Sequence, residues 1–259
     1  MKPPFENAVV VVTGASTGLG RAIAVGAAGQ GARVVAIGYS ASEAEAQETA
    51  RQVRDMGAEA LLVRGNVAQD DDCRAIADAM APYGRIDALF CNAGKTTPRA
   101  AYPHQLDKLS GEDFLDVYRV NVVGTFQTIR ACRDLMEQSD RAAVVVTSSV
   151  AGVTGNGSSI AYSASKAALN TMVLTLAIGL APKIRINALA PGFIDTGWFD
   201  KLGPHRDKIR QSVAERAPLK VASQPEDIAG TALFLASEAA CRITGETLIA
   251  DAGLRLVGG

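Results

Sequence analysis

The sequence predicts a single α/β domain in which helices flank a doubly wound, seven-stranded parallel sheet. Short apolar segments rich in valine, isoleucine and leucine alternate with helical patterns along the chain. These segments are nearly continuous in their apolar character, as expected of strands that are covered on both faces. No linker or change of composition divides the 259 residues, and this length is enough for one large domain.

Each expected strand is a short apolar run that ends at glycine, polar or charged residues. We place the strands at Ala8–Thr13, Ala32–Gly38, Ala58–Arg64, Ile86–Cys91, Ala142–Ser148, Ile184–Leu189 and Thr247–Ala250. Helical patterns cover Gly18–Gln30, Glu43–Met56, Asp70–Tyr83, Glu112–Gln138, Ile160–Leu180 and Pro225–Ala236. Strand–helix–strand repetition requires parallel pairing through right-handed crossovers. At the second helix, Ser42 and Glu45 form a capping-box pattern, and Gly57 is expected to end the helix.

Composition argues against several classes of function. A net charge of −1 gives neither a broad basic surface for nucleic acid nor a polybasic membrane anchor. The N-terminus lacks the pattern of a secretion signal, and polar residues interrupt the apolar helix Ile160–Leu180, which we expect in the core. The four cysteines are scattered and only two histidines are present, so we expect no metal site. A reducing cytoplasm is the simplest location.

A glycine-rich turn follows the first strand and opens the first helix. Glycines at 14, 18 and 20 allow a tight turn, and the helix N-terminus offers N–H groups to a phosphate. Any one of these glycines could serve packing alone. Together, within one strand–helix–strand unit, they indicate a dinucleotide site. Its candidate contacts are Gly14, Ser16, Thr17, Gly18, Leu19 and Gly20.

The spacing of these glycines resembles the loop of the short-chain dehydrogenase/reductase family, and other motifs of that family follow in its order. Asn92-Ala93-Gly94 resembles its NAG motif, and Pro191-Gly192 resembles its PG turn. The chain as a whole is most similar to the 3-oxoacyl-carrier-protein-reductase-like subgroup, whose members act on different ketones. The resemblance implies a Rossmann domain over residues 1–259 and an NAD(P)-dependent oxidoreductase that interconverts a ketone and a secondary alcohol.

The resemblance also covers a candidate catalytic set. Tyr162-x-x-x-Lys166 resembles the YxxxK motif of the family, and Ser149 and Asn121 stand where it has its catalytic serine and asparagine. In that family the lysine also binds the nicotinamide ribose, and the asparagine anchors a water that relays protons. The glycine turn, Asn92–Gly94, Ser149 and Pro191–Gly192 all follow strand ends, so they should meet at one edge of the sheet.

Tyrosine and lysine four residues apart lie on one helix face, although this pairing is common on ordinary helices. An ammonium group stabilises a phenolate, and lowering the tyrosine pKa by ~2–3 units corresponds to roughly 3–4 kcal/mol. Tyr162 is therefore expected to act as acid in reduction and base in oxidation. Ser149 is expected to hydrogen-bond the substrate oxygen. The catalytic interpretation depends on the joint occurrence of this set with the glycine turn.

The end of the second strand favours NADP(H) over NAD(H). Gly38 occupies the place where NAD-dependent relatives tend to carry an aspartate, and hydroxyls nearby could bind a 2′-phosphate. Thr17, where NADP-dependent relatives often have a basic residue, and Glu43 argue the other way. The candidate cofactor contacts here are Tyr39, Ser40 and Ser42. Elsewhere they are Asn66, Val67, Asn92, Ala93, Gly94, Tyr162, Lys166, Pro191, Gly192, Ile194 and Thr196.

The expected partner is a small carbonyl or alcohol substrate, held under a lid around residues 193–220. Trp198, Phe199 and Leu202 would give this lid a partly apolar surface. The family resemblance implies a homo-oligomer, either a tetramer or a dimer. The alternative is a cofactor-binding regulatory or structural subunit without turnover. An epimerase or dehydratase would need a larger C-terminal domain than this length allows.

Overall fold

The computed structural model describes residues 3–97, 106–197 and 205–257. Within them, parallel strands form one sheet in the order β3-β2-β1-β4-β5-β6-β7. The strands are β1 (Val9–Val12), β2 (Val34–Tyr39), β3 (Glu59–Arg64), β4 (Ala88–Cys91), β5 (Ala143–Thr147), β6 (Arg185–Pro191) and β7 (Thr247–Ala250). The predicted fold class, a doubly wound parallel sheet, is confirmed.

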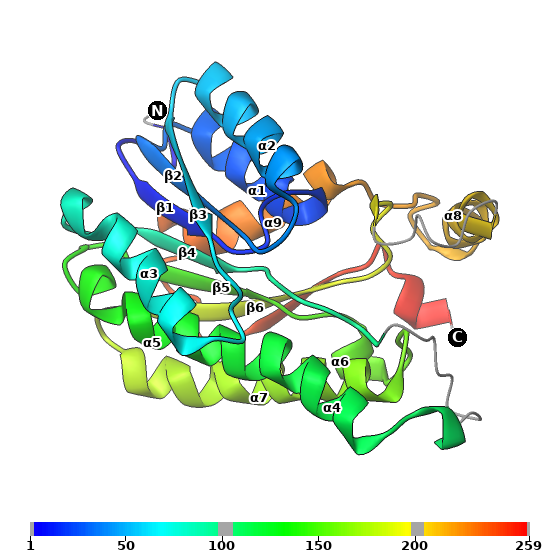
Figure 1. The fold of residues 1–259 in the computed structure, drawn as a ribbon. Coiled ribbons are helices and arrows are strands. Elements are labelled where there is room, and N and C mark those ends of the chain that lie inside the picture. The colour runs from blue at the N-terminus through cyan, green and yellow to red at the C-terminus, as the bar shows by residue number, and fades with distance from the viewer. Residues whose placement is uncertain (1–2, 98–105, 198–204, 258–259) are drawn as a thin grey trace.

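Helices cover both faces of this sheet (Figure 1). One face carries α1 (Gly18–Gly29), α2 (Glu43–Asp55) and α9 (Pro225–Ala236). The other carries α3 (Asp70–Met80), α5 (Gly124–Met136) and α7 (Ile160–Leu180). The helices α4 (Gly111–Tyr118) and α6 (Ala151–Thr154) lie near α7, and α8 (His205–Arg216) stands apart from both layers (Figure 1).

The first strand shows why its residues are apolar without interruption. Successive side chains of a strand point to opposite faces, so Val10 and Val12 pack under α1, α2 and α9 while Val9 and Val11 pack under α3, α5 and α7. All four valines are fully buried. Full burial of a valine side chain contributes about 1.5–3 kcal/mol, which favours a strand enclosed between two helix layers.

The helix predicted over Glu112–Gln138 is present from Gly111 to Met136, but it is not a regular α-helix throughout. A π-helical turn, Arg119–Val123, separates α4 from α5. Inside it the Asn121 side chain accepts a hydrogen bond from the Lys95 backbone N–H at 2.8 Å and donates to the Lys95 carbonyl at 3.0 Å. It also donates to the Ser165 hydroxyl at 2.9 Å. These contacts fix Asn121 in the widened turn, a feature often found at functional sites.

The start of α2 also differs from its prediction. Ser42 is the N-cap residue, but its side chain makes no capping hydrogen bond. The carboxylate of Glu45 binds Arg21 of α1 instead, at 2.7 Å, so the predicted capping box does not form. The predicted end of the helix is confirmed, because Gly57 follows it with a φ of +90°, a conformation that favours glycine.

Helix α8 lies within the segment predicted as a lid and was missed because its sequence is almost entirely polar. None of its residues is buried. A bridge between Ile194 and Ser223 closes the base of this segment, and Asp195 holds the helix through Arg206 at 2.8 Å. Trp198, Phe199 and Leu202 fall outside the described residues.

Helix α7 is long and apolar enough to cross a membrane by length and composition alone. In the structure it packs against β6, and Leu169, Val173 and Ala177 are buried in the core, as the sequence predicted. Its opposite face carries the exposed side chains of Leu174 and Ile178.

Candidate active site

A cleft of about 320 Å³ opens at the carboxyl edge of the sheet. The order of the strands reverses between β1 and β4, and open α/β sheets bind their ligands at such a switch point. Most of the predicted site residues line this cleft. They are Gly14, Ser16, Thr17, Gly18, Leu19, Asn92, Ala93, Gly94, Ser149, Tyr162, Lys166, Pro191, Gly192, Ile194 and Thr196.

The glycine turn needs its glycines for conformation and for space. Gly14 and Gly18 have φ angles of +62° and +55°. A Cβ on Gly14 would lie 2.8 Å from the Cα of Ala93, and a Cβ on Gly20 would overlap the Gly14 carbonyl oxygen. Helix α1 begins directly after Thr17, whose side chain forms no cap, so the N–H groups of the first turn can receive an anion.

Asn92 joins the ends of three strands below the cleft. Its amide donates to the carbonyl oxygens of Thr13 and Gly14 at 3.2 and 3.1 Å, and its Oδ1 accepts from the Thr147 hydroxyl at 3.2 Å. The hydroxyl of Thr13 accepts the N–H groups of Asn92 and Ala93, both at 3.1 Å. Because both N–H donors of the Asn92 amide are used within the protein, this side chain supports the glycine turn.

Tyr162 stands in the first turn of α7. The hydroxyl of Ser159 caps this helix by accepting the Tyr162 N–H at 3.1 Å. The Ser149 hydroxyl hydrogen-bonds the phenol, which lowers the pKa of Tyr162, but desolvation by the surrounding protein is larger and raises that pKa above its ordinary value. The net direction is opposite to the lowered pKa that the Tyr–Lys spacing predicted.

Lys166 lies one helical turn further, with Nζ 5.5 Å from the centre of the Tyr162 ring. The side chain is buried, and Nζ donates to the Thr147 carbonyl at 2.7 Å. Burial penalises the ammonium form and lowers the pKa of Lys166 to about 8. Desolvation therefore dominates both groups and favours their neutral forms.

Asn121 does not line the cleft but lies directly behind it. A Cβ on Gly94 would be 3.4 Å from Asn121 Oδ1 and 3.6 Å from Lys166 Nζ, so both side chains lie close to Gly94. The hydroxyl of Ser165, which accepts from Asn121, donates to the Tyr162 carbonyl at 2.7 Å. Asn121 is thus tied to the helix that carries Tyr162 and Lys166.

The other predicted cofactor contacts also lie outside the lining of the cleft. They are Gly20, Tyr39, Ser40, Ser42, Asn66 and Val67. Gly20 and Tyr39 are buried, Ser40, Ser42 and Asn66 are exposed, and Val67 packs against Gly124. Gly38 also has a packing reason, since a Cβ there would lie 3.2 Å from the Cα of Thr13.

Sequence reasoning missed several polar residues of the site. Thr147 and Ser148 line the cleft, and Thr13 supports the turn. Their positions at the carboxyl ends of β1 and β5 were the available signal, because such ends form the binding edge. Within the described ranges, no three His, Cys, Asp or Glu side chains are grouped so that they could hold a metal ion.

Comparison with known proteins identifies the family to which this chain belongs. A family model described as enoyl-(acyl carrier protein) reductase matches residues 14–255. The 3-oxoacyl-(acyl-carrier-protein) reductase FabG of Staphylococcus epidermidis is 32% identical over 250 residues, covering 96% of this chain and 99% of that protein. The cis-4-hydroxycyclohexanecarboxylate dehydrogenase of Sinomonas cyclohexanicum is 36% identical over 259 residues, covering 99% and 100%.

A solved structure agrees with these relatives. The structure described as a short-chain dehydrogenase/reductase from Burkholderia xenovorans has a TM-score of 0.89 and 40% sequence identity, and the match covers 96% of this chain and 98% of that one. The chain is therefore an oxidoreductase that belongs to the short-chain dehydrogenase/reductase family.

Proposed function

We propose that this protein interconverts a ketone and a secondary alcohol with NADP(H), using Tyr162 as the acid/base. The observation that carries the proposal is that Ser149, Tyr162 and Lys166 share one cleft with the glycine turn. The side chains that would bind and protonate the substrate therefore line the same cleft as the glycine turn that would bind the pyrophosphate.

The residues of the cleft fit a dinucleotide. The turn between β1 and α1 has no room for side chains at Gly14 and Gly20, whose Cβ atoms would meet protein atoms, so glycine keeps this turn tight beside the cleft. The first turn of α1 would hold the pyrophosphate. Ile194 and Thr196 also line the cleft, and by their match to the family they would contact the nicotinamide. A bound reduced nicotinamide supplies the hydride that the carbonyl carbon accepts.

The side chains of this chain handle the proton. Ser149 and Tyr162, already hydrogen-bonded to each other, would both donate to the substrate oxygen. In reduction the Tyr162 Oη–H bond breaks and the proton passes to that oxygen, which becomes the alcohol hydroxyl. Protonated Lys166 and the positive end of the α7 dipole would stabilise the phenolate left behind. Oxidation of the alcohol reverses these transfers.

NADP(H) is the preferred cofactor in this proposal. The second strand ends without a carboxylate at Gly38, and Ser40 and Ser42 are exposed hydroxyls before α2. A 2′-phosphate would meet hydrogen-bond donors there rather than the acidic residue that usually accepts a ribose hydroxyl.

The FabG relative leads us to propose 3-oxoacyl thioesters as the first substrates to test, and the cyclohexanecarboxylate dehydrogenase adds cyclic alcohols. We also propose that the protein forms a dimer or tetramer, because α7 exposes the apolar side chains of Leu174 and Ile178. Its proposed location is the cytoplasm. Residues 193–220 would serve as the substrate lid.

NADPH oxidation over 3-oxoacyl thioesters, cyclic ketones and aryl ketones tests the reaction. Tyr162→Phe should retain NADPH binding and lose ~10²-fold or more in turnover, because it keeps the ring and removes the proton donor. The matched control is Tyr83→Phe, whose phenol binds Glu59 away from the cleft. Full activity of Tyr162→Phe would reject its role. NADPH binding without turnover of any ketone would favour the alternative, a cofactor-binding subunit.

A further inference from the structure

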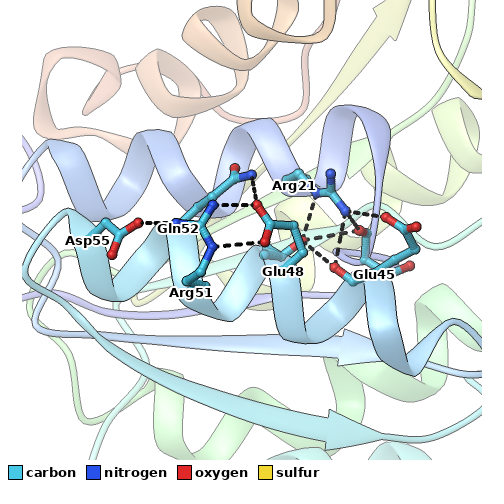
Figure 2. Close-up of polar contacts among 8 residues, drawn as sticks. Arg21, Glu45, Glu48, Arg51, Gln52 and Asp55 are labelled. Atoms are coloured by element: carbon cyan, nitrogen blue, oxygen red, sulfur yellow. Dashed lines mark hydrogen bonds and ion pairs between the residues drawn. The ribbon is translucent and has the colours of Figure 1, made fainter.

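Arg21 connects the glycine turn to the beginning of α2 (Figure 2). Its Nη2 atom donates to the Ser16 carbonyl at 2.6 Å and to the Glu45 carboxylate at 2.7 Å. It also lies 3.1 Å from the Glu45 carbonyl, and Nε donates to the Thr49 hydroxyl at 2.9 Å. Nε and Nη2 of Arg21 therefore bind groups of the protein itself.

These contacts place the Glu45 carboxylate beside the cofactor cleft. Ser16 lines the cleft, and its carbonyl oxygen and the Glu45 carboxylate both lie within 2.7 Å of the same Arg21 nitrogen. The Ala15 N–H donates to the Gly38 carbonyl at 2.9 Å, so the turn is also bound to the last part of β2. In open α/β sheets this corner is where charge discriminates between a ribose hydroxyl and a 2′-phosphate.

Charge at this corner affects the two cofactors differently. A carboxylate without a partner repels a phosphate that carries nearly two negative charges, whereas it accepts a hydrogen bond from a ribose hydroxyl. The Glu45 carboxylate pairs with Arg21 at 2.7 Å, and this ion pair offsets its charge. Glu43, the other acidic residue at this end of α2, is exposed and stays the same in every variant below.

We propose that Arg21 is a specificity-determining positioning residue, which admits a 2′-phosphate by holding Glu45 in an ion pair. The proposal rests on the proposed function only in that the cleft binds a nicotinamide dinucleotide. If Arg21 served only to fasten α1 to α2, its loss would weaken the binding of both cofactors equally.

The test compares 2′,5′-ADP with 5′-AMP, which differ only in the 2′-phosphate, by calorimetry on the full chain at low salt. Arg21→Gln is expected to weaken the binding of 2′,5′-ADP about tenfold more than the binding of 5′-AMP, because the substitution leaves Glu45 without its partner. Glu45→Gln should shift the ratio of affinities toward 2′,5′-ADP. The double variant and Arg21→Lys should return the ratio to within about threefold of the wild type. Screening by salt should reduce each difference.

The same helix provides a matched control. Arg51 forms ion pairs with Glu48 and Asp55 further along α2, so Arg51→Gln removes an equivalent charge away from the cleft (Figure 2). The ion pairs of Arg51 are exposed and add little to stability, whereas the side chain of Arg21 is 25% exposed, so circular dichroism checks that each variant folds. The ratio should not change in Arg51→Gln, and a change as large as in Arg21→Gln would overturn the proposal.

The outcomes separate this inference from the proposed function. An unchanged ratio in both Arg21→Gln and Glu45→Gln, or an equal loss of both nucleotides, rejects the role of Arg21. A wild type that binds 5′-AMP and NADH but not 2′,5′-ADP rejects it as well, and leaves the dinucleotide site standing. A wild type that binds none of these nucleotides, NADPH included, rejects the proposed function itself.

Discussion

Burying the ammonium of Lys166 should cost this protein stability, and the cost should depend on pH. Lys166→Met keeps a side chain of similar length and removes the charge. It also removes the hydrogen bond to the Thr147 carbonyl, which lowers stability by an amount that does not vary with pH. The difference between wild type and variant thus has a constant part and a part that comes from the charge.

The size of the charge-dependent part follows from the two pKa values of the lysine. Burial lowers the pKa from an ordinary 10.5 to about 8, which corresponds to about 3 kcal/mol. Below pH 8 both the folded and unfolded chains carry the ammonium, and the folded state bears the full penalty. Between pH 8 and pH 10.5, Lys166 has released its proton in the folded chain but retains it in the unfolded chain. The wild type should therefore gain stability relative to Lys166→Met as pH rises, by about 2 kcal/mol from pH 7 to 9.5.

Urea unfolding of both proteins at fixed protein concentration, from pH 7 to 9.5, measures this gain. Lys183→Met is the matched control, because Lys183 is exposed and its ammonium stays in water. The stability difference between wild type and Lys183→Met should be constant over this range. The argument from burial would be refuted if the stability difference between wild type and Lys166→Met were also constant. It would be refuted as well if the variant gained stability relative to the wild type as pH rises.

Four further outcomes are expected. Gly20→Ala should lower the free energy of unfolding by about 2 kcal/mol and weaken NADPH binding, since its Cβ would overlap the glycine turn; urea unfolding and a binding titration measure both. Ala252→Gly should stabilise by about 1 kcal/mol in urea, because Ala252 has a φ of +54°. Asp195→Asn should speed hydrogen exchange in α8 and raise the KM for the ketone, and unchanged exchange would contradict its role as anchor. Ile178→Glu should lower the mass in sedimentation, since this side chain is 82% exposed on α7; an unchanged mass would place any subunit contact elsewhere.

The sheet and its binding edge could be predicted because a single physical constraint specifies them. A strand covered on both faces must be apolar at every position, and the valines of β1 satisfy this without help from distant residues. The glycine turn could also be predicted from the sequence. The spacing of its glycines follows from the local backbone conformation and from the close approach of the turn to Ala93.

Features that depend on distant partners could not be predicted. Ser42 and Glu45 have the spacing of a capping box, yet Arg21 lies close enough in the folded chain to take the carboxylate. Asn121, in the π-helical turn, is hydrogen-bonded to Lys95 and to Ser165 of another helix. Nothing in the local periodicity signals either contact, because local patterns describe one segment at a time.

The pKa of Tyr162 shows how distant packing changes chemistry that the motif alone suggests. The motif places an ammonium near a phenol, which favours the phenolate, whereas the surrounding protein disfavours charge on both groups. A phenol whose pKa lies above its ordinary value remains protonated at neutral pH, which is the form that reduction requires. The phenolate then forms only where positive charge stabilises it, next to protonated Lys166 and at the first turn of α7. In the proposed reaction, burial would therefore confine the charged form of Tyr162 to the moment of proton transfer, and the protonation of Lys166 would be the condition for that transfer.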